Sequence, residues 1–143
     1  GASVGFWPPM RPSRALAYWH GVLEEVKAGS VLLLVAEEGG TVVGSVQLAP
    51  SAKENGPHLA DVRKLFVLAA RQRCGIGRAL LEAVEAEARA RGRTCLVLDT
   101  RTGDPSERLY ARAGWVRVGE IPRYVREHDG TETGTTVYYR HLA

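Results

Sequence analysis

A strand, a glycine-containing turn, a helix and a second strand follow one another within residues 59–99, and this succession restricts the fold more than any other feature. Residues 59–67 alternate in part, as a half-buried strand does. Residues 77–91 repeat apolar side chains at helical spacing, and Gly92 follows them as a stop signal. Residues 94–99 are almost continuously apolar, which is typical of a strand covered on both faces. The stretch therefore predicts a β-α-β unit with two parallel strands.

The flanking segments extend this unit into a larger sheet. Gly39-Gly40 lies between two apolar runs, which predicts a β-hairpin. Asp104 followed by Pro105 predicts the start of a short helix. The expected elements are, in chain order, a helix over 13–28, strands over 31–36, 41–48 and 59–67, a helix over 77–91, a strand over 94–99, a short helix ended by Gly114, and strands from 115 and over 135–140. This order predicts an α/β fold with a central mixed β-sheet flanked by helices.

Composition limits the class of protein. The 143 residues, of which 45% are hydrophobic and 24% charged, predict one domain over residues 1–143. No apolar run approaches the roughly 20 residues of a membrane span, and residues 1–9 lack the features of a signal peptide. The net charge of +3 comes from 19 basic residues interleaved with 16 acidic ones. Because these charges form no basic stripe, we expect neither a nucleic acid nor a membrane as partner.

The two cysteines carry a further expectation. Cys74 and Cys95 are too few for a disulfide framework and lack the spacing of a metal site. We therefore expect a protein of the reducing cytoplasm that holds no metal. The sequence leaves the oligomeric state open, and a homodimer is one of the options.

The turn before the central helix is suited to an anion. Gly75 and Gly77 let the backbone come close to a ligand, and the first amides of the following helix have no intrahelical partners. Arg73 and Arg78 add positive charge. The alternative is a tight strand-to-helix connection without a ligand. A P-loop is excluded because the Gly-Lys-Ser/Thr triplet is missing, and a dinucleotide fold fits less well because Leu80 replaces the third glycine.

The same turn resembles a known family. The run from Gln72 to Gly77 is similar to the Q/R-x-x-G-x-G/A signature of the GCN5-related N-acetyltransferase (GNAT) family, and residues 109–115 resemble its L-Y-x-x-x-G-F segment. The resemblance implies a GNAT-like acyl-CoA N-acyltransferase fold that uses acetyl-CoA. It implies that the pantetheine arm lies along the last residues of the strand and that the turn holds the pyrophosphate. The cofactor-binding residues implied are Leu65, Phe66, Val67, Gln72, Arg73, Cys74, Gly75, Ile76, Gly77 and Arg78.

Within the family, residues 1–6, 98–100 and 119–124 look closest to the tabtoxin-resistance type of acetyltransferase. The sequence departs from the family at two places. Gly103 stands where the family usually has an asparagine that contacts the cofactor. The family also begins with a strand and a helix before the helix expected at Ser13, and these elements are missing from the expected order.

Acetyl transfer to an amine needs a base, an oxyanion donor and an acid for the departing thiolate. Tyr110 matches the family's general acid, and its reference pKa of about 10 is close to that of a thiol. The alternative is a tyrosine that only packs its ring. Asp61 matches the offset of the family's base, although it could also be a solvated acid at the strand end. Asp99 ends a strand where open α/β sheets bind ligands, so it could bind the substrate ammonium, join the proton path or only hold loop amides.

Other side chains are weaker candidates. His58 could shuttle protons or be merely exposed. Phe6, Trp7 and Trp19 could line the acceptor pocket, with a core role favoured for Trp19. Three functions remain open: a small-molecule N-acetyltransferase acting on an amino-acid-like or antibiotic amine, a protein or peptide N-acetyltransferase, and a non-catalytic acyl-CoA-binding module. We expect the first.

Overall fold

The computed structural model describes residue 24 and residues 26–142. Its strands and helices are, in chain order, β1 (Leu32–Glu38), β2 (Thr41–Pro50), β3 (Leu59–Val67), a 3-10 turn (Ala69–Arg71), α2 (Ile76–Ala90), β4 (Cys95–Arg101), α3 (Ser106–Arg112), β5 (Val116–Arg126) and β6 (Glu132–His141). Most of the helix expected over 13–28 lies outside the described residues; residues 24, 26 and 27 are helical.

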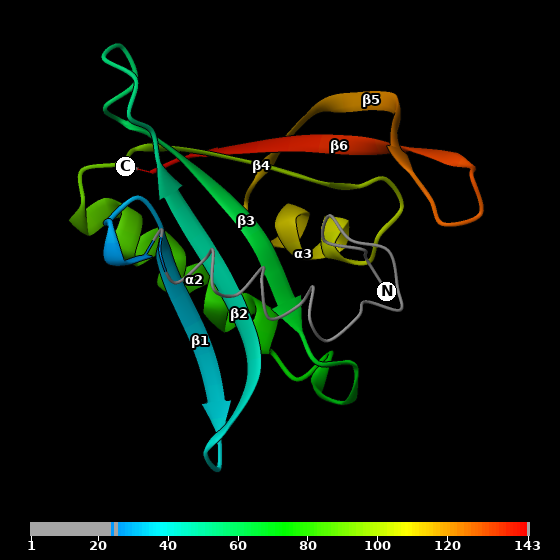
Figure 1. Ribbon diagram of the computed structural model, residues 1–143, viewed down its shortest axis with the longest axis horizontal. Helices are drawn as coiled ribbons and strands as arrows, with labels where there is room; N and C mark the ends of the chain where they lie inside the picture. The colour runs from blue at the N-terminus through cyan, green and yellow to red at the C-terminus, as the bar shows by residue number, and fades with distance from the viewer. Residues whose placement is uncertain (1–23, 25, 143) are drawn as a thin grey trace.

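The strands of the described part form a six-stranded sheet in the order β1-β2-β3-β4-β6-β5 (Figure 1). Strands β3 and β4 are parallel, and α2 connects them, as the β-α-β prediction requires. The other neighbouring strands pair antiparallel. The predicted mixed sheet is therefore confirmed, and its parallel pair lies at the centre.

Both described helices cover the same face of the sheet, where the core lies. Successive strand residues point to opposite faces, so Ala60 and Val62 of β3 share this face with Leu96 and Leu98 of β4. Helix α2 adds one apolar stripe to the same cluster, and α3 adds Tyr110. The opposite face carries the alternate residues of β3 and β4. We call it the outer face.

Core packing gives a direct prediction for stability. Leu81 of α2 is 0% exposed and belongs to the cluster between helix and sheet. We expect Leu81→Ala to lower the free energy of unfolding by about 2–5 kcal/mol, because the lost side chain leaves a cavity. Val118→Ala on β5, where the side chain is 63% exposed, is the control and should change it by less than about 0.5 kcal/mol. Urea unfolding followed by circular dichroism compares them, and equal losses would contradict the assigned core.

The ends of the elements follow local chemistry in most places. Gly39 and Gly40 have φ of 54° and 82°, as a two-residue hairpin turn requires. Strand β6 begins at Glu132, earlier than the predicted start at residue 135, because residues 132 and 133 pair with β5 although their side chains are polar. No helix in the described part of the chain is both long and apolar enough to cross a membrane.

Candidate active site

The central parallel strands separate soon after they meet. Pairing between β3 and β4 runs from Leu59–Cys95 to Asp61–Val97, and beyond it the two strands diverge (Figure 1). A β-bulge causes part of this change of direction: Lys64 has φ of 56°, at the point where the register between β2 and β3 shifts. The last residues of β3 therefore pair with β2 on one side and have no ladder partner from β4 on the other.

The glycine turn lies at the end of β3. Gly75 has φ of 81° and precedes the first residue of α2, and Arg73 also has a positive φ of 63°. The amide of Ala79 donates to the carbonyl of Gly75 at 3.0 Å, so the amides of residues 76–78 lie before this first helical bond. The side chain of Gln72 donates to the carbonyl of Val67 at 3.3 Å and ties the turn to the strand. The turn therefore places backbone amides without intrahelical partners at the start of α2.

Glycine is needed at the two positions of the turn for different structural reasons. Gly75 needs its left-handed backbone, whereas Gly77 is required by close packing. A Cβ on Gly77 would lie 3.3 Å from Cδ2 of Leu109, in α3. Gly77 therefore sets how closely the start of α2 approaches α3. Arg78 is held by an ion pair with Glu82 at 3.0 Å.

Tyr110 lies on α3, with 5% of its surface exposed. Its ring packs against Trp115 and Tyr138, with centroids 6.0 and 5.7 Å away. Burial raises the pKa of Tyr110 well above its ordinary value, the charge of Asp104 adds to the rise, and a hydrogen bond with Ser106 opposes it. The near match to a thiol pKa expected from the sequence is wrong for this buried phenol. Tyr110 is therefore protonated at neutral pH, and its hydroxyl is available as a proton donor.

A hydrogen-bonded anchor fixes the helix that carries Tyr110. The hydroxyl of Tyr138 donates to Oε1 of Glu107 at 2.6 Å, and the amide of Gly103 donates to Oε2 at 2.7 Å. Burial and this hydrogen bond raise the pKa of Tyr138 to about 12. Gly103 has φ of 85°, a conformation that glycine adopts without cost and that asparagine tolerates. Because the anchor uses only the backbone amide of residue 103, a glycine there is compatible with it.

The anchor predicts a pH-dependent contribution to stability. Burial raises the pKa of Glu107, but the hydrogen bonds from Tyr138, the Gly103 amide and Thr136 outweigh burial and hold this pKa below 4.5. A carboxyl with a lowered folded pKa stabilises the protein above its unfolded pKa and loses that effect as the pH falls through the folded pKa. We expect Glu107→Gln to be less stable than wild type at neutral pH, with a difference that shrinks below pH 4.5. The urea midpoints of both proteins, measured from neutral pH to below pH 4.5, give this difference in stability. A difference that stays constant over this pH range would contradict the role of the Glu107 carboxylate in the anchor.

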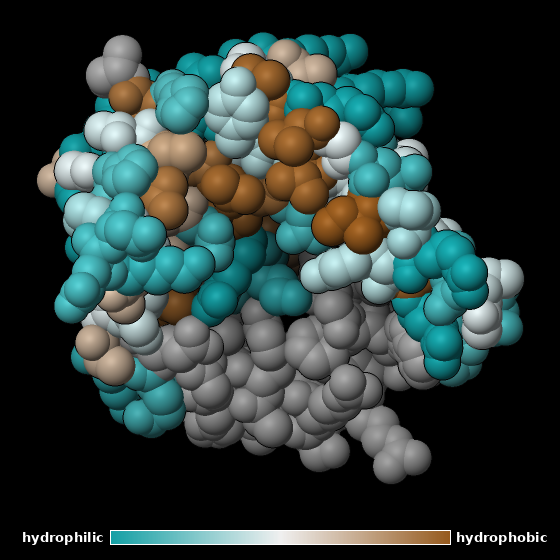
Figure 2. Space-filling view, turned by 90° about the horizontal axis from the view of Figure 1, so that it is seen from above, coloured by the Kyte–Doolittle hydropathy of each residue, from teal (hydrophilic) through white to brown (hydrophobic). Residues whose placement is uncertain are grey.

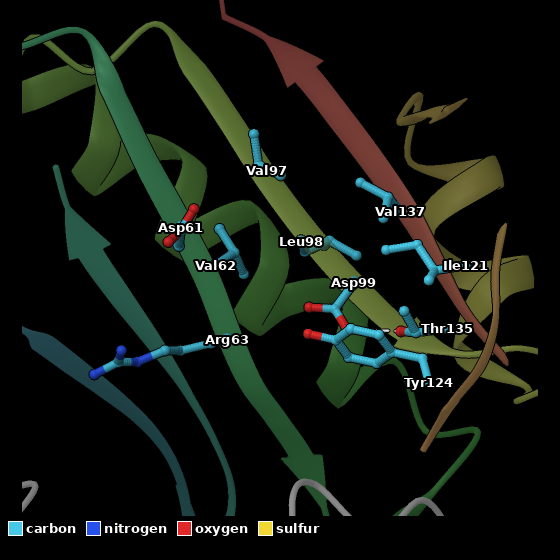
Figure 3. A pocket seen from close by; sticks show the side chains of 10 residues that line it. All are labelled: Asp61, Val62, Arg63, Val97, Leu98, Asp99, Ile121, Tyr124, Thr135 and Val137. Atoms are coloured by element: carbon cyan, nitrogen blue, oxygen red, sulfur yellow. Dashed lines mark hydrogen bonds between the residues drawn. The ribbon is translucent and has the colours of Figure 1, made fainter. Parts of the chain in front are cut away.

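The outer face carries both carboxylates predicted from the sequence. Asp61 and Asp99 are exposed there and line one cavity of about 290 Å³ (Figure 3). The hydroxyl of Thr135 donates to Oδ2 of Asp99 at 2.6 Å. Among the described residues, the cavity is lined by Asp61, Val62, Arg63, Val97, Leu98, Asp99, Ile121, Tyr124, Thr135 and Val137. We call it the first cavity.

Two charges next to this cavity lie on β3. Burial and the neighbouring Arg63 lower the pKa of Lys64, while the charge of Asp99 opposes this shift. Nε of Arg63 donates to the side chain of Gln47 at 3.2 Å, and Gln47 is buried on β2. The Arg63 side chain thus extends from the cavity toward β2, away from Asp99 (Figure 3).

Strand β5 supplies the apolar border of the same face. A view from above, onto the side where β4, β5 and β6 lie, shows hydrophobic side chains gathered in the middle and hydrophilic ones around them (Figure 2). Val116, Val118, Ile121 and Tyr124 of β5 are exposed by 46–63%. A register shift between Ile121 and Val125, with φ of 56° at Arg123, accompanies the turn of Tyr124 toward the first cavity.

Some predicted residues do not join the site. His58 is exposed and lines neither described cavity, although its carbonyl accepts the amide of Cys95. Cys74 is exposed in the turn, and its thiol donates to the carbonyl of Gln72 at 3.6 Å. Phe6, Trp7 and Trp19 lie outside the described residues. Within residues 24 and 26–142, no group of three or more potential ligands could hold a metal ion.

Sequence reasoning assigned no role to Tyr124 or Thr135. Tyr124 belongs to the segment that carries the narrower resemblance, which was the available signal. No sequence signal pointed to Thr135, because its hydrogen bond to Asp99 depends on the pairing of β4 with β6.

Comparisons with known proteins agree with this geometry. Residues 4–115 match the model of the acetyltransferase (GNAT) family. The IAA acetyltransferase of Azospirillum brasilense is 34% identical over 103 residues, which are 71% of this chain; the chain spans 65% of that relative's length, slightly less than two thirds.

Solved structures agree as well. The ribosomal-protein-alanine N-acetyltransferase of Brucella melitensis is similar with a TM-score of 0.78 and 26% identity, over 89% of this chain and 78% of that one. An acetyltransferase of Salmonella typhimurium, solved with its cofactor acetyl-CoA, has the same fold with a TM-score of 0.77 and 23% identity, over 94% of this chain and 75% of that one. These similarities confirm the predicted GNAT-like fold. Because the family model matches residues 4–115, well over half of the chain, the chain belongs to the GNAT family of acetyltransferases.

Proposed function

We propose that the protein transfers the acetyl group of acetyl-CoA to a primary amine of a small molecule. The observation that carries this proposal is the divergence of β3 and β4 directly after Asp61 and Val97. It leaves the backbone of the last β3 residues accessible from the β4 side, between the glycine turn and a buried tyrosine. The acids lie on the outer face, and Tyr110 lies on the helical face. Donor and acceptor can therefore approach from opposite faces of one sheet.

The residues of the turn fit the anionic part of acetyl-CoA. The amides of residues 76–78 precede the first helical bond, and together with the positive end of the α2 dipole they favour a phosphate. Arg73 adds a positive charge beside them. The backbone of residues 65–67 would pair with the amides of the pantetheine arm. The bound molecule supplies an acyl thioester, whose carbonyl carbon the amine attacks.

The carboxylates would act on the acceptor. Asp61 takes a proton from the ammonium group, directly or through one water, and the free amine then forms the new C–N bond. Asp99, oriented by Thr135, holds the ammonium group in place before this step. As the C–S bond breaks, Tyr110 gives its proton to the departing thiolate. The nitrogen gives up two protons in all, one to Asp61 before the attack and one after the C–N bond has formed. One proton restores the hydroxyl of Tyr110 after it has protonated the thiolate, and the other passes to solvent.

The size of the first cavity favours a small acceptor. Its volume of about 290 Å³ lies near the lower end of ligand pockets, which begin at about 300 Å³. The narrower resemblance to the tabtoxin-resistance type favours an amino-acid-like or antibiotic amine. The similarity to a ribosomal-protein-alanine N-acetyltransferase keeps a peptide amine as the second candidate.

An acceptor screen tests the proposed function. Purified protein with acetyl-CoA is offered amino acids, aminoglycosides, simple amines and an alanine-starting peptide, and free thiol is measured. We expect amine-dependent thiol release with at least one small amine. Release only with the peptide would favour the second candidate. Tight CoA binding without release for any acceptor would instead favour a non-catalytic binding module.

The two carboxylates are separated by their amide variants. We expect Asp61→Asn to lower kcat/KM by about 100-fold, mainly through kcat, because a general base typically contributes about 10²–10⁴-fold. Asp99→Asn should raise KM more than it lowers kcat, since it keeps a bond to Thr135 but loses the charge that holds the ammonium. Glu54→Gln, on an exposed loop, is the control. If Asp61→Asn mainly raised KM and Asp99→Asn mainly lowered kcat, Asp99 would be the base and Asp61 the residue that binds the ammonium group.

A further inference from the structure

A second cavity opens on the outer face on the other side of Asp61. Its volume is about 510 Å³, and it lies between the start of β3 and the loop that follows β2. In the part of the chain that the structure describes, it is lined by Ala49, Pro50, Ser51, Ala52, Lys53, Leu59, Asp61 and Val97. Asp61 and Val97 also line the first cavity, so the two cavities meet at these side chains.

The strand register explains this arrangement. Ala49 of β2 pairs with Asp61 of β3, and Asp61 pairs with Val97 of β4. These three residues form one row across the outer face. The first cavity lies on the side of the row where β3 and β4 diverge. The second cavity lies on the side where they are paired, above Leu59, so no strand separation is available there for a cofactor.

The loop that walls the second cavity is held in place. The amide of Ser51 donates to the carbonyl of Leu59 at 3.0 Å. Nη1 of Arg93 donates to the carbonyls of both residues, at 3.1 and 3.2 Å. A Cβ on Gly56 would lie 2.9 Å from Cδ1 of Leu59, so the loop also closes tightly on itself. Three hydrogen bonds to backbone carbonyls and close packing therefore fix this loop. A fixed loop is suited to a binding site, because it loses little conformational entropy when a ligand enters.

The charges of the second cavity lie at opposite sides of an apolar lining. Asp61 stands at the junction with the first cavity, and Lys53 lies on the loop. Between them the lining is mainly aliphatic, from Ala49, Pro50 and Leu59. Lys53 makes no ion pair with any residue that the structure describes. A ligand that matches this pattern carries a cation at one end, an anion at the other and an apolar chain between them.

We propose that the second cavity binds the tail of the acceptor, and that the acceptor is an amine with an aliphatic chain ending in a carboxylate. This inference rests on the proposed function. The first cavity takes the amine, next to Asp61 and Asp99, and the thioester reaches it where β3 and β4 diverge. The remainder of the acceptor extends from Asp61 across the row to the other side, into the second cavity. Its carboxylate there meets the ammonium group of Lys53.

Two matched acceptors test the inference. Hexylamine and 6-aminohexanoate differ only in the terminal carboxylate, and the ratio of their kcat/KM values isolates its contribution. We expect wild type to prefer 6-aminohexanoate and Lys53→Ala to lower the preference about threefold to fivefold, the scale of an exposed ion pair. Lys53→Glu should lower it further, and Lys53→Arg should retain it. Glu54→Ala, next in the same loop but outside the lining, is the control and should leave the ratio unchanged.

Failure of the tail site and failure of the proposed function give different results. If wild type acetylates hexylamine and the ratio is the same in all Lys53 variants, the proposed function stands and the tail site is overturned. If wild type acetylates neither amine, binding of 6-acetamidohexanoate is measured by NMR titration. Binding that Lys53→Glu weakens supports the tail site while counting against the proposed function. Absence of binding to wild type overturns the tail site.

Discussion

Tyr110→Phe is expected to lower kcat by about 10²- to 10³-fold and to leave the Kd for acetyl-CoA within about twofold, because general acids contribute on this scale. The phenylalanine ring can keep the packing against Trp115 and Tyr138, so the variant removes the hydroxyl and little else. Because burial and the charge of Asp104 keep the phenol protonated, the variant removes a proton donor and not a base. The loss of kcat should therefore be smaller for an acyl donor whose thiolate leaves without protonation.

Steady-state thiol release and calorimetric titration with acetyl-CoA measure the two quantities. Tyr139→Phe is the matched control, because Tyr139 lies on β6, packs against His141 and lines neither cavity. It should change kcat by less than about threefold. A kcat of Tyr110→Phe near that of wild type would show that the tyrosine only packs. An equal loss of cofactor affinity would assign it to binding.

Gly75→Val is expected to raise the Kd for acetyl-CoA by about 10- to 100-fold. Gly75 has φ of 81°, a conformation that costs a β-branched residue about 1–3 kcal/mol. The turn relieves this strain by changing its backbone, which moves the amides of residues 76–78 away from a common ligand. No atom lies within 4 Å of a Cβ at this position, so the loss does not come from a steric clash within the protein.

Gly92→Val is the control that separates the effect of backbone strain on stability from the effect of the turn on acetyl-CoA binding. Gly92 follows the other end of α2, has φ of 72° and has the same open surroundings. Its valine variant should lose comparable stability but keep the wild-type Kd, as measured by thermal unfolding and calorimetric titration. If both variants weakened acetyl-CoA binding equally, the turn before α2 would have no special part in holding the cofactor.

Local signals predicted the elements that position the cofactor. Strand β3 was expected over the residues it occupies, and α2 begins one position from its predicted start. The glycine at position 75 and the apolar stripe of α2 are short-range features, which depend on backbone geometry and helical spacing. The family resemblance then connected this turn with Tyr110, which lies far from it in sequence.

The shape of the site depends on long-range pairing that the sequence does not display. Lys64 adopts φ of 56° in the bulge of β3 although neither glycine nor proline marks the position. The end of parallel pairing at Asp61 and Val97 follows from how two strands twist and pack, and so do both cavities. The anchor around Glu107 joins a loop, a helix and a strand, which no local pattern predicts.

The most direct test of the cofactor site is a crystal structure of the protein with CoA. We expect the pyrophosphate on the amides of residues 76–78, next to Arg73, and the pantetheine arm along residues 65–67 with its thiol directed toward Tyr110. A pyrophosphate bound elsewhere, with the turn before α2 empty in the presence of bound CoA, would contradict this expectation.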